Sequence, residues 1–174
     1  MINPSKQAER SPTAAHVENN GRCARCTPMP HLEKGCASLY CVIMPSSLIE
    51  VRRPYTAHEE IAIINAVHTS LVAAFKIPEE DRYIRLLSYE PHRMVNGLEE
   101  GHPDYYTRVT IDCFSGRSID AKRALYREIV ERLEAVGIPR DSVSILLREN
   151  PPENWGLNGG QAASDFDLGF NINV

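Results

Sequence analysis

Met44-Pro45 lies just before a short apolar run, and this dipeptide has the clearest chemical potential in the chain. If the working chain starts after Met44, Pro45 carries a free secondary amine at the start of a strand. Such an amine acts as a general base when its pKa lies near the working pH. An apolar pocket and a neighbouring cation both lower that pKa, because both disfavour the ammonium form. If Met44 stays attached, the same nitrogen is an amide without basicity, and Pro45 is an ordinary proline at a strand edge.

Arg117 stands at the expected start of a second helix, directly after Ser115-Gly116. Cations are disfavoured at a helix N-terminus by roughly 0.3–1 kcal/mol. An arginine combined with the free N–H groups of a helix start nevertheless makes a good carboxylate site. We therefore expect Arg117 to bind a substrate carboxylate, with a surface ion pair to Asp120 as the alternative.

Two further residues are candidates for the same site. Asp81 follows Pro78-Glu79-Glu80, where it can hold a proton or orient a water, or simply serve as a turn carboxylate. Trp155, the single tryptophan, can wall an apolar pocket and offer its indole N–H to a ligand, or it can anchor the tail against a neighbouring subunit. His68 lies on an apolar helix stripe and is expected to be a packed, hydrogen-bonded core histidine.

The elements that must position these residues are strands alternating with helices. Apolar patterning predicts strands at 48–53, 84–89, 106–114 and 142–147, with a strand-like piece at 168–174. Thr56, with Glu59 in the capping-box position, starts a helix that ends before Pro78, and Ser118 starts a second helix that Pro139 closes. The residues expected to face the core are Ile61, Ile64, His68, Leu71, Val72 and Phe75 in the first helix, and Ile119, Leu125, Tyr126, Ile129, Leu133 and Val136 in the second.

The two halves of this pattern match each other. A shift of 61 residues places Ala74-Phe75-Lys76-Ile77-Pro78 on Ala135-Val136-Gly137-Ile138-Pro139. Each helix is long enough to connect parallel strands, and such crossovers are right-handed. The predicted fold class is therefore α/β, with tandem β-α-β units forming a four-stranded mixed sheet and both helices on one face. The uncovered face indicates self-association.

Residues 1–43 differ from the rest in composition. They are rich in Pro, Ser, Asn and Gly without periodicity, which indicates a flexible leader, or upstream sequence translated from a misplaced start, before a domain at 45–174. Four cysteines in the leader permit a zinc site as the alternative; they are Cys23, Cys26, Cys36 and Cys41. Cys113 lies in an apolar strand and is expected to be a small buried hydrophobe.

Charge and hydropathy exclude several classes of protein. The net charge of −4 gives no basic surface for nucleic acid. No apolar run reaches the about 18 residues that cross a bilayer, and the start of the chain lacks a secretory signal. We therefore expect a cytoplasmic protein without nucleic-acid or membrane partners, and no metal in the domain.

The order and spacing of these residues resemble the tautomerase superfamily over about residues 45–174. The matching residues are Ala74-Phe75-x-Ile77-Pro78-x-x-Asp81-Arg82-Tyr83, then Gly116-Arg117-Ser118 with Lys122 and Leu125-Tyr126, and finally Glu149-Asn150, Asn154-Trp155-Gly156 and Gly159-Gly160. Within the superfamily the chain looks most like the longer members, namely malonate semialdehyde decarboxylase and related uncharacterised tautomerase-like proteins.

The resemblance implies a cofactor-free homotrimer in which Pro45 is the base, Asp81 its partner and Arg117 the carboxylate binder. Ser115 stands where the decarboxylase has a second arginine. We therefore expect a tautomerase or isomerase, or a related lyase, that acts on a small 2-oxo or unsaturated carboxylic acid. The alternative is a non-catalytic trimeric binding or scaffold protein in which Pro45 is internal.

Overall fold

The computed structural model describes residues 44–97, 101–157 and 159–165. They form a four-stranded sheet in the order β2-β1-β3-β4. Its strands are β1 (Ser46–Val51), β2 (Tyr83–Ser88), β3 (Thr107–Phe114) and β4 (Val143–Asn150). The pairs β1–β2 and β3–β4 are parallel, and the central pair β1–β3 is antiparallel. This is the mixed sheet of tandem β-α-β units that the sequence predicts.

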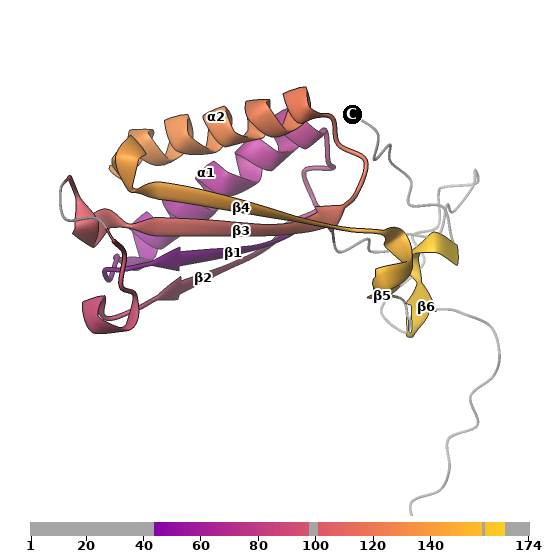
Figure 1. Ribbon diagram of the computed structural model, residues 1–174, viewed down its shortest axis with the longest axis horizontal. Helices are drawn as coiled ribbons and strands as arrows, with labels where there is room; N and C mark the ends of the chain where they lie inside the picture. Colours follow the sequence, from indigo (N-terminus) through magenta and orange to yellow (C-terminus); the bar gives the residue numbers. More distant parts are fainter. Residues whose placement is uncertain (1–43, 98–100, 158, 166–174) are drawn as a thin grey trace, which may run out of the picture. The chain divides into compact units, whose positions relative to one another are not determined.

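Both helices cover the same face of the sheet and pack against each other (Figure 1). Helix α1 spans Ala57–Phe75, and the predicted capping box is present between Thr56 and Glu59. Helix α2 spans Ile119–Ala135, and the Ser118 hydroxyl accepts a hydrogen bond from the Ala121 N–H at 3.1 Å. The two predicted N-caps are therefore confirmed, and they fix where each helix leaves the sheet edge.

The core lies between the helices and the sheet, and the predicted helix stripes are partly wrong. Ile61 and Ile119 are 57% and 58% exposed, so they do not face the core. Among the described residues the buried helix positions are instead Ile63, Ala66, Val67, His68, Ser70, Leu71 and Phe75 in α1, and Leu125, Ile129 and Leu133 in α2. Apolar residues occur on nearly every side of α1, so composition alone did not define its inner face.

All four strands differ from the prediction by one to three residues at one end or both, most at β1 and β4. Strand β1 ends at Val51, and the side chain of the next residue, Arg52, bonds the Met94 carbonyl and Asp104 in the connection between β2 and β3. Strand β4 continues to Asn150, because it pairs with β3 as far as Phe114. An ion pair between Arg148 and Asp112, at 2.8 Å, joins the two strands along this added length.

Short elements complete the described part of the chain. A two-stranded hairpin of β5 (Gly156–Leu157) and β6 (Gln161–Ala162) follows β4. Single 3-10 turns span Pro91–Arg93, Pro103–Tyr105, Arg140–Ser142, Pro152–Asn154 and Ala163–Asp165. The leader with its four cysteines and the predicted strand at 168–174 lie outside the described residues. Within the described ranges, neither helix is long and apolar enough to cross a bilayer.

Candidate active site at one edge of the sheet

The strand directions bring the four predicted site residues to one edge of the sheet. Strands β1 and β2 begin at this edge, and β3 and β4 end there, as the arrows in Figure 1 show. Pro45 directly precedes β1 and Asp81 lies just before β2, whereas Arg117 and Trp155 follow β3 and β4. Residues that are far apart in the sequence therefore share one edge because of the pairing pattern.

Arg117 is a buried cation with few partners. Its side chain is 5% exposed, and its Nη1 donates a hydrogen bond of 2.8 Å to the Phe114 carbonyl. The guanidinium lies over the Phe75 ring, 5.0 Å from the ring centre. Its Nε has no hydrogen-bond partner. The alternative ion pair with Asp120 is not formed, because Asp120 pairs with Arg123 at 3.2 Å.

Neighbouring groups leave the charge of Arg117 without a dedicated counter-ion among the described residues. Burial lowers the pKa of Arg117, an effect that Cys113 and Glu149 oppose. Burial raises the pKa of the Cys113 thiol to about 11, so this thiol is neutral at pH 7. The Glu149 carboxylate pairs with Lys122 at 2.6 Å. A buried cation in this state favours binding of an anion.

Trp155 adds an apolar wall with one free donor. Its ring meets Phe114 edge-on, with the ring centres 5.9 Å apart. The indole Nε1 is buried and has no hydrogen-bond partner. Arg117 and Trp155 thus both contact Phe114, and both retain an unused N–H beside it.

Asp81 carries a carboxyl group with a raised pKa. Burial, and then the charge of Glu80, raise the pKa of Asp81 to about 6, and its Oδ2 has no hydrogen-bond partner. Next to it, the ring of His68 interacts with the backbone of Asp81 and Glu79, and burial followed by the charge of Arg82 lowers the pKa of His68. His68 is buried as predicted, but its Nε2 is also without a partner. The structure therefore places a carboxyl group of raised pKa, in the loop that leads into β2, beside an imidazole of lowered pKa on α1.

Pro45 is buried and is joined to Met44, whose side chain is 1% exposed. Its ring nitrogen is accordingly an amide in this chain and carries no lone pair for base catalysis. Ser47, two residues later, has a buried hydroxyl without a hydrogen-bond partner. The start of β1 thus presents a buried proline amide and a buried hydroxyl without a partner.

Unpartnered polar groups concentrate at this edge. Of the six buried side-chain atoms without a hydrogen-bond partner among the described residues, four belong to Ser47, Asp81, Arg117 and Trp155. A fifth belongs to His68, which contacts the loop carrying Asp81. Buried polar groups normally find partners, so such a concentration marks a place where a ligand can supply them.

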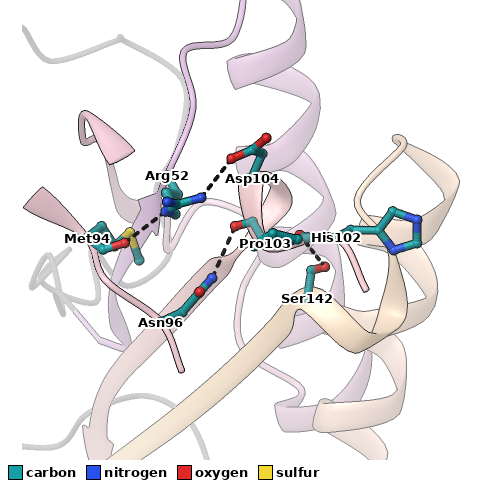
Figure 2. A network of polar contacts seen from close by, with 7 residues as sticks. All are labelled: Arg52, Met94, Asn96, His102, Pro103, Asp104 and Ser142. Carbon is teal, nitrogen blue, oxygen red and sulfur yellow. Dashed lines mark hydrogen bonds and ion pairs between the residues drawn. The ribbon is translucent and has the colours of Figure 1, made fainter. Parts of the chain in front are cut away.

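The opposite edge of the sheet carries the sixth such atom, the Tyr55 hydroxyl, but several of its other polar side chains are paired. Figure 2 shows Arg52 bonded to Asp104 and the Met94 carbonyl, Asn96 to the Pro103 carbonyl, and Ser142 to the His102 carbonyl. These contacts tie the connection between β2 and β3 onto the ends of β1 and β4. We interpret this edge as structural.

Two surface hollows flank the loop that carries Asp81, and both are lined by Arg82. One has a volume of about 250 Å³ beside Ser46 and Tyr83, and the other about 320 Å³ beside His68 and Glu79. Neither is lined by Pro45, Arg117 or Trp155. Within the described ranges, no three His, Cys, Asp or Glu side chains are grouped as metal ligands.

Three residues of this edge were missing from the predicted site. Phe75 and Phe114 form the aromatic surroundings of Arg117, and Met44 is buried at the start of β1. Both phenylalanines stand at or near the ends of predicted elements, so the sequence could have indicated that they lie at this edge. The burial of Met44 had none, because it follows the leader.

The comparisons with known sequences agree on one family. The sequence model of the family described as tautomerase enzyme matches residues 81–158. A 2-hydroxymuconate tautomerase of Comamonas testosteroni is 40% identical over 48 residues, which cover 27% of this chain and 76% of that protein. A probable tautomerase of Bacillus subtilis is 27% identical over 103 residues, covering 58% and 80% of the two chains.

Solved structures give the same result. A malonate semialdehyde decarboxylase is 27% identical with a TM-score of 0.63, over 71% of this chain and all (100%) of that one. A fused 4-OT reaches a TM-score of 0.64 at 20% identity, over 72% of this chain and 100% of that one, and therefore supports the fold alone. Sequence relatives, sheet order and the placement of the helices together establish that the chain belongs to the tautomerase superfamily.

Proposed function

We propose that the chain is a cofactor-free tautomerase or isomerase, or a related lyase, acting on a small 2-oxo or unsaturated carboxylic acid. Arg117 carries this proposal, because it is 5% exposed and lacks a counter-ion among the described residues. A planar guanidinium suits a carboxylate, which can accept two parallel hydrogen bonds from it. The carboxylate of the substrate would thus supply the counter-ion that Arg117 lacks.

Pro45 is the proposed base once the bond to Met44 is cut. The free ring nitrogen would lie at the start of β1, at the sheet edge that also carries Arg117. Apolar surroundings and a guanidinium both lower the pKa of an amine toward the range in which it works as a base. The amine would take a proton from the carbon next to the carbonyl, while Arg117 stabilises the carboxylate or the enolate that forms.

Asp81 is the proposed partner that holds or returns the proton. A pKa raised to about 6 leaves a fraction of this carboxyl protonated near neutral pH, as a general acid requires. Trp155 is the proposed wall of the substrate pocket, since its Nε1 has a hydrogen still to donate. Isomerisation, decarboxylation, hydration and dehalogenation share such a pocket and differ by the groups that surround the reacting residues.

Turnover of an enol substrate tests the proposal. A chain that begins at Met44, from which the initiator methionine is removed, is expected to convert phenylenolpyruvate to its keto form. The reaction is followed by the change in ultraviolet absorbance. The matched Pro45→Ala chain should lose at least about 100-fold in kcat/KM, because general-base catalysis contributes 10²–10⁴-fold. N-terminal sequencing must accompany the assay. A free Pro45 without turnover, or undiminished activity of Pro45→Ala, refutes the proline mechanism.

The second candidate is a non-catalytic binding or scaffold protein of the same fold. The burial of Met44 favours it, because the intact chain presents an amide at Pro45. N-terminal sequencing of the protein from its native source separates the two functions. A mature chain in which Met44 still precedes Pro45 excludes the enzymatic function with Pro45 as base. A mature chain that starts at Pro45 removes this argument for the binding or scaffold function. The cytoplasmic location expected from the sequence stays a prediction under either function.

A homotrimer is proposed for both functions. Leu87 and Leu146 lie on the sheet face away from the helices and are 47% and 39% exposed, which supports burial of this face by other subunits. One solved fused 4-OT of the same fold is described as a symmetric trimer, at 21% identity. Light scattering after size exclusion should give three times the chain mass. Leu87→Lys should lower the measured mass to that of a monomer. If the unaltered chain and Leu87→Lys both have the mass of a monomer, the trimer is refuted.

A further inference from the structure

We propose that Lys122 is a positioning residue of the site: by holding the carboxylate of Glu149, it keeps the guanidinium of Arg117 open to the substrate anion. The inference rests on the proposed function, because it concerns the availability of the same cation. It goes beyond that function by assigning a role to an ion pair that the proposed reaction does not use, and by stating what closes the site when the pair is broken.

The ion pair between Lys122 and Glu149 is short and shielded. The Lys122 Nζ lies 2.6 Å from the Glu149 Oε2, and the two side chains are 20% and 29% exposed. In no other ion pair among the described residues are both side chains less than 30% exposed. Because solvent weakens exposed pairs the most, this pair holds the Glu149 carboxylate at a defined place.

The pair lies beside Arg117. Glu149 on β4 is the register partner of Cys113 on β3. Lys122 lies one turn into α2, where its backbone N–H bonds the carbonyl of Ser118, the residue after Arg117. Burial raises the pKa of the Cys113 thiol, and the next largest effects come from the charges of Arg117, Glu149 and Lys122, in that order. The three charges therefore lie around one buried side chain, at the sheet edge that carries the site.

Glu149 is the internal competitor for the substrate at Arg117. Its charge already acts on the guanidinium, because burial lowers the pKa of Arg117 and Glu149 is one of the two groups that oppose this effect. A carboxylate can accept two parallel hydrogen bonds from a guanidinium, whereas an ammonium meets it as a point charge. In the described part of the chain, however, the Glu149 carboxylate pairs with Lys122. Lys122 thus withholds from Arg117 the same chemical group that the substrate brings.

Two further carboxylates close to the start of α2 are engaged elsewhere. Asp112, near the end of β3, pairs with Arg148 at 2.8 Å. Strand side chains alternate between the two faces of a sheet, so Asp112 points away from the helices. Asp120, in the first turn of α2, pairs with Arg123 at 3.2 Å, and its side chain is 87% exposed. Glu149 is therefore the acid whose release would neutralise the guanidinium.

Binding of propanoate to the full-length chain tests the inference without any need for catalysis, and the fluorescence of Trp155, the single tryptophan, reports it. Lys122→Met releases the Glu149 carboxylate toward Arg117. We expect it to bind propanoate at least about tenfold more weakly than the unaltered chain, as the loss of one charge-assisted hydrogen bond implies. Lys122→Arg keeps a cation for Glu149 and should bind within about threefold of the unaltered chain. Propanamide, which has the same size but no charge, should bind equally to all of these proteins.

Removal of Glu149 separates a positioning role from the alternatives. Without the competing carboxylate, the double variant Lys122→Met/Glu149→Gln should regain propanoate affinity to within about threefold of the unaltered chain. Glu149→Gln alone should bind propanoate at least as tightly as the unaltered chain. If Lys122 contacted the anion itself, or if the ion pair only stabilised the fold, the double variant would bind as weakly as Lys122→Met.

A second ion pair of α2 provides the matched control. Arg132→Met breaks the pair of Arg132 with Glu128, which are 2.8 Å apart and farther along the helix, and it changes the net charge equally. It should bind propanoate as tightly as the unaltered chain. Lys122→Gln carries the same expectation as Lys122→Met and replaces it if that variant does not fold. The inference is overturned if both Lys122 variants stay within about twofold of the unaltered chain, if Glu149→Gln does not restore the lost affinity, or if Arg132→Met loses as much.

The outcome is independent of the proline mechanism. If propanoate binding follows this pattern but a chain starting at Pro45 shows no turnover of phenylenolpyruvate, the proposed function fails and the role of Lys122 stands. If that chain is active but the pattern is absent, the role of Lys122 alone is wrong. If no protein of the series binds propanoate, both the anion site at Arg117 and the role of Lys122 are refuted.

Discussion

Replacing Arg117 by methionine tests whether the site is built for an absent anion. A cation that serves the fold has partners within the protein, and its removal is strongly destabilising. A buried cation that is paired only by a ligand lowers the free energy of unfolding of the unliganded protein. The structure supports the second description, because the side chain is 5% exposed and its described protein contacts are the Phe114 carbonyl and the Phe75 ring.

The expected magnitude follows from these contacts. Burying a cation costs several kcal/mol even after the protein relaxes. One charge-assisted hydrogen bond returns about 1.5–3 kcal/mol, and one cation–π contact returns about 0.5–2 kcal/mol. Arg117→Met removes all three terms, fills most of the side-chain volume, and leaves the Phe114 carbonyl without its donor, at about 1–3 kcal/mol. These terms nearly cancel, so we expect Arg117→Met to change the free energy of unfolding of the unliganded chain by no more than about 1 kcal/mol.

Urea denaturation followed by circular dichroism measures this change. Arg117→Ala is the matched control, because it removes the same charge but leaves a cavity, and we expect it to be about 2–4 kcal/mol less stable than Arg117→Met. Carboxylate binding should be lost in both variants. If Arg117→Met instead lowers the free energy of unfolding by more than about 2 kcal/mol, the guanidinium is a structural group and the anion site is wrong.

Three further predictions concern other residues. Folded Asp81 has a pKa of about 6 against 3.8 in the unfolded chain, so the folded state binds more protons between these values and stability falls as pH rises from about 4 to 6. Asp81→Asn should flatten this fall in urea titrations, and an unchanged slope would contradict the pKa. Thr56→Ala should lower the free energy of unfolding by about 1 kcal/mol, since its hydroxyl caps α1 and accepts from the Glu59 N–H, and thermal unfolding should detect the loss. Trp155→Phe keeps the contact with Phe114 but deletes an unpaired N–H, so it should weaken substrate binding without lowering the melting temperature; a drop in both would indicate a structural role.

The architecture could be predicted because it depends on repeated local signals. The N-cap residues Thr56 and Ser118 predict where both helices start, and the internal repeat predicts two β-α-β crossovers. These constraints leave few topologies for a four-stranded sheet, since crossovers are right-handed. Once the strand directions are known, the edge shared by Pro45 and Arg117 follows from chain order alone.

The inner face of the helices and the state of the site could not be predicted in the same way. Ile61 is apolar but 57% exposed, because burial depends on how α1 rotates against the sheet rather than on composition. The burial of Met44 depends on the core that the sheet and both helices form together, whose residues come from separate elements. The raised pKa of Asp81 likewise arises mainly from tertiary burial, and the charge of its sequence neighbour Glu80 accounts for the smaller part.

The duplication of the β-α-β unit gives the sheet two comparable edges, and their difference argues for where chemistry occurs. At the edge of Figure 2, the side chains of Arg52 and Ser142 reach carbonyl and carboxylate partners, although the Tyr55 hydroxyl lacks one. At the other, Arg117 and Trp155 keep unused donors at a buried position. A fold gains nothing from leaving such groups unpaired, since each costs about 1–3 kcal/mol. A ligand that pairs them would turn the same penalty into binding energy, and this supports the proposal that the substrate binds at this edge of the internally repeated fold.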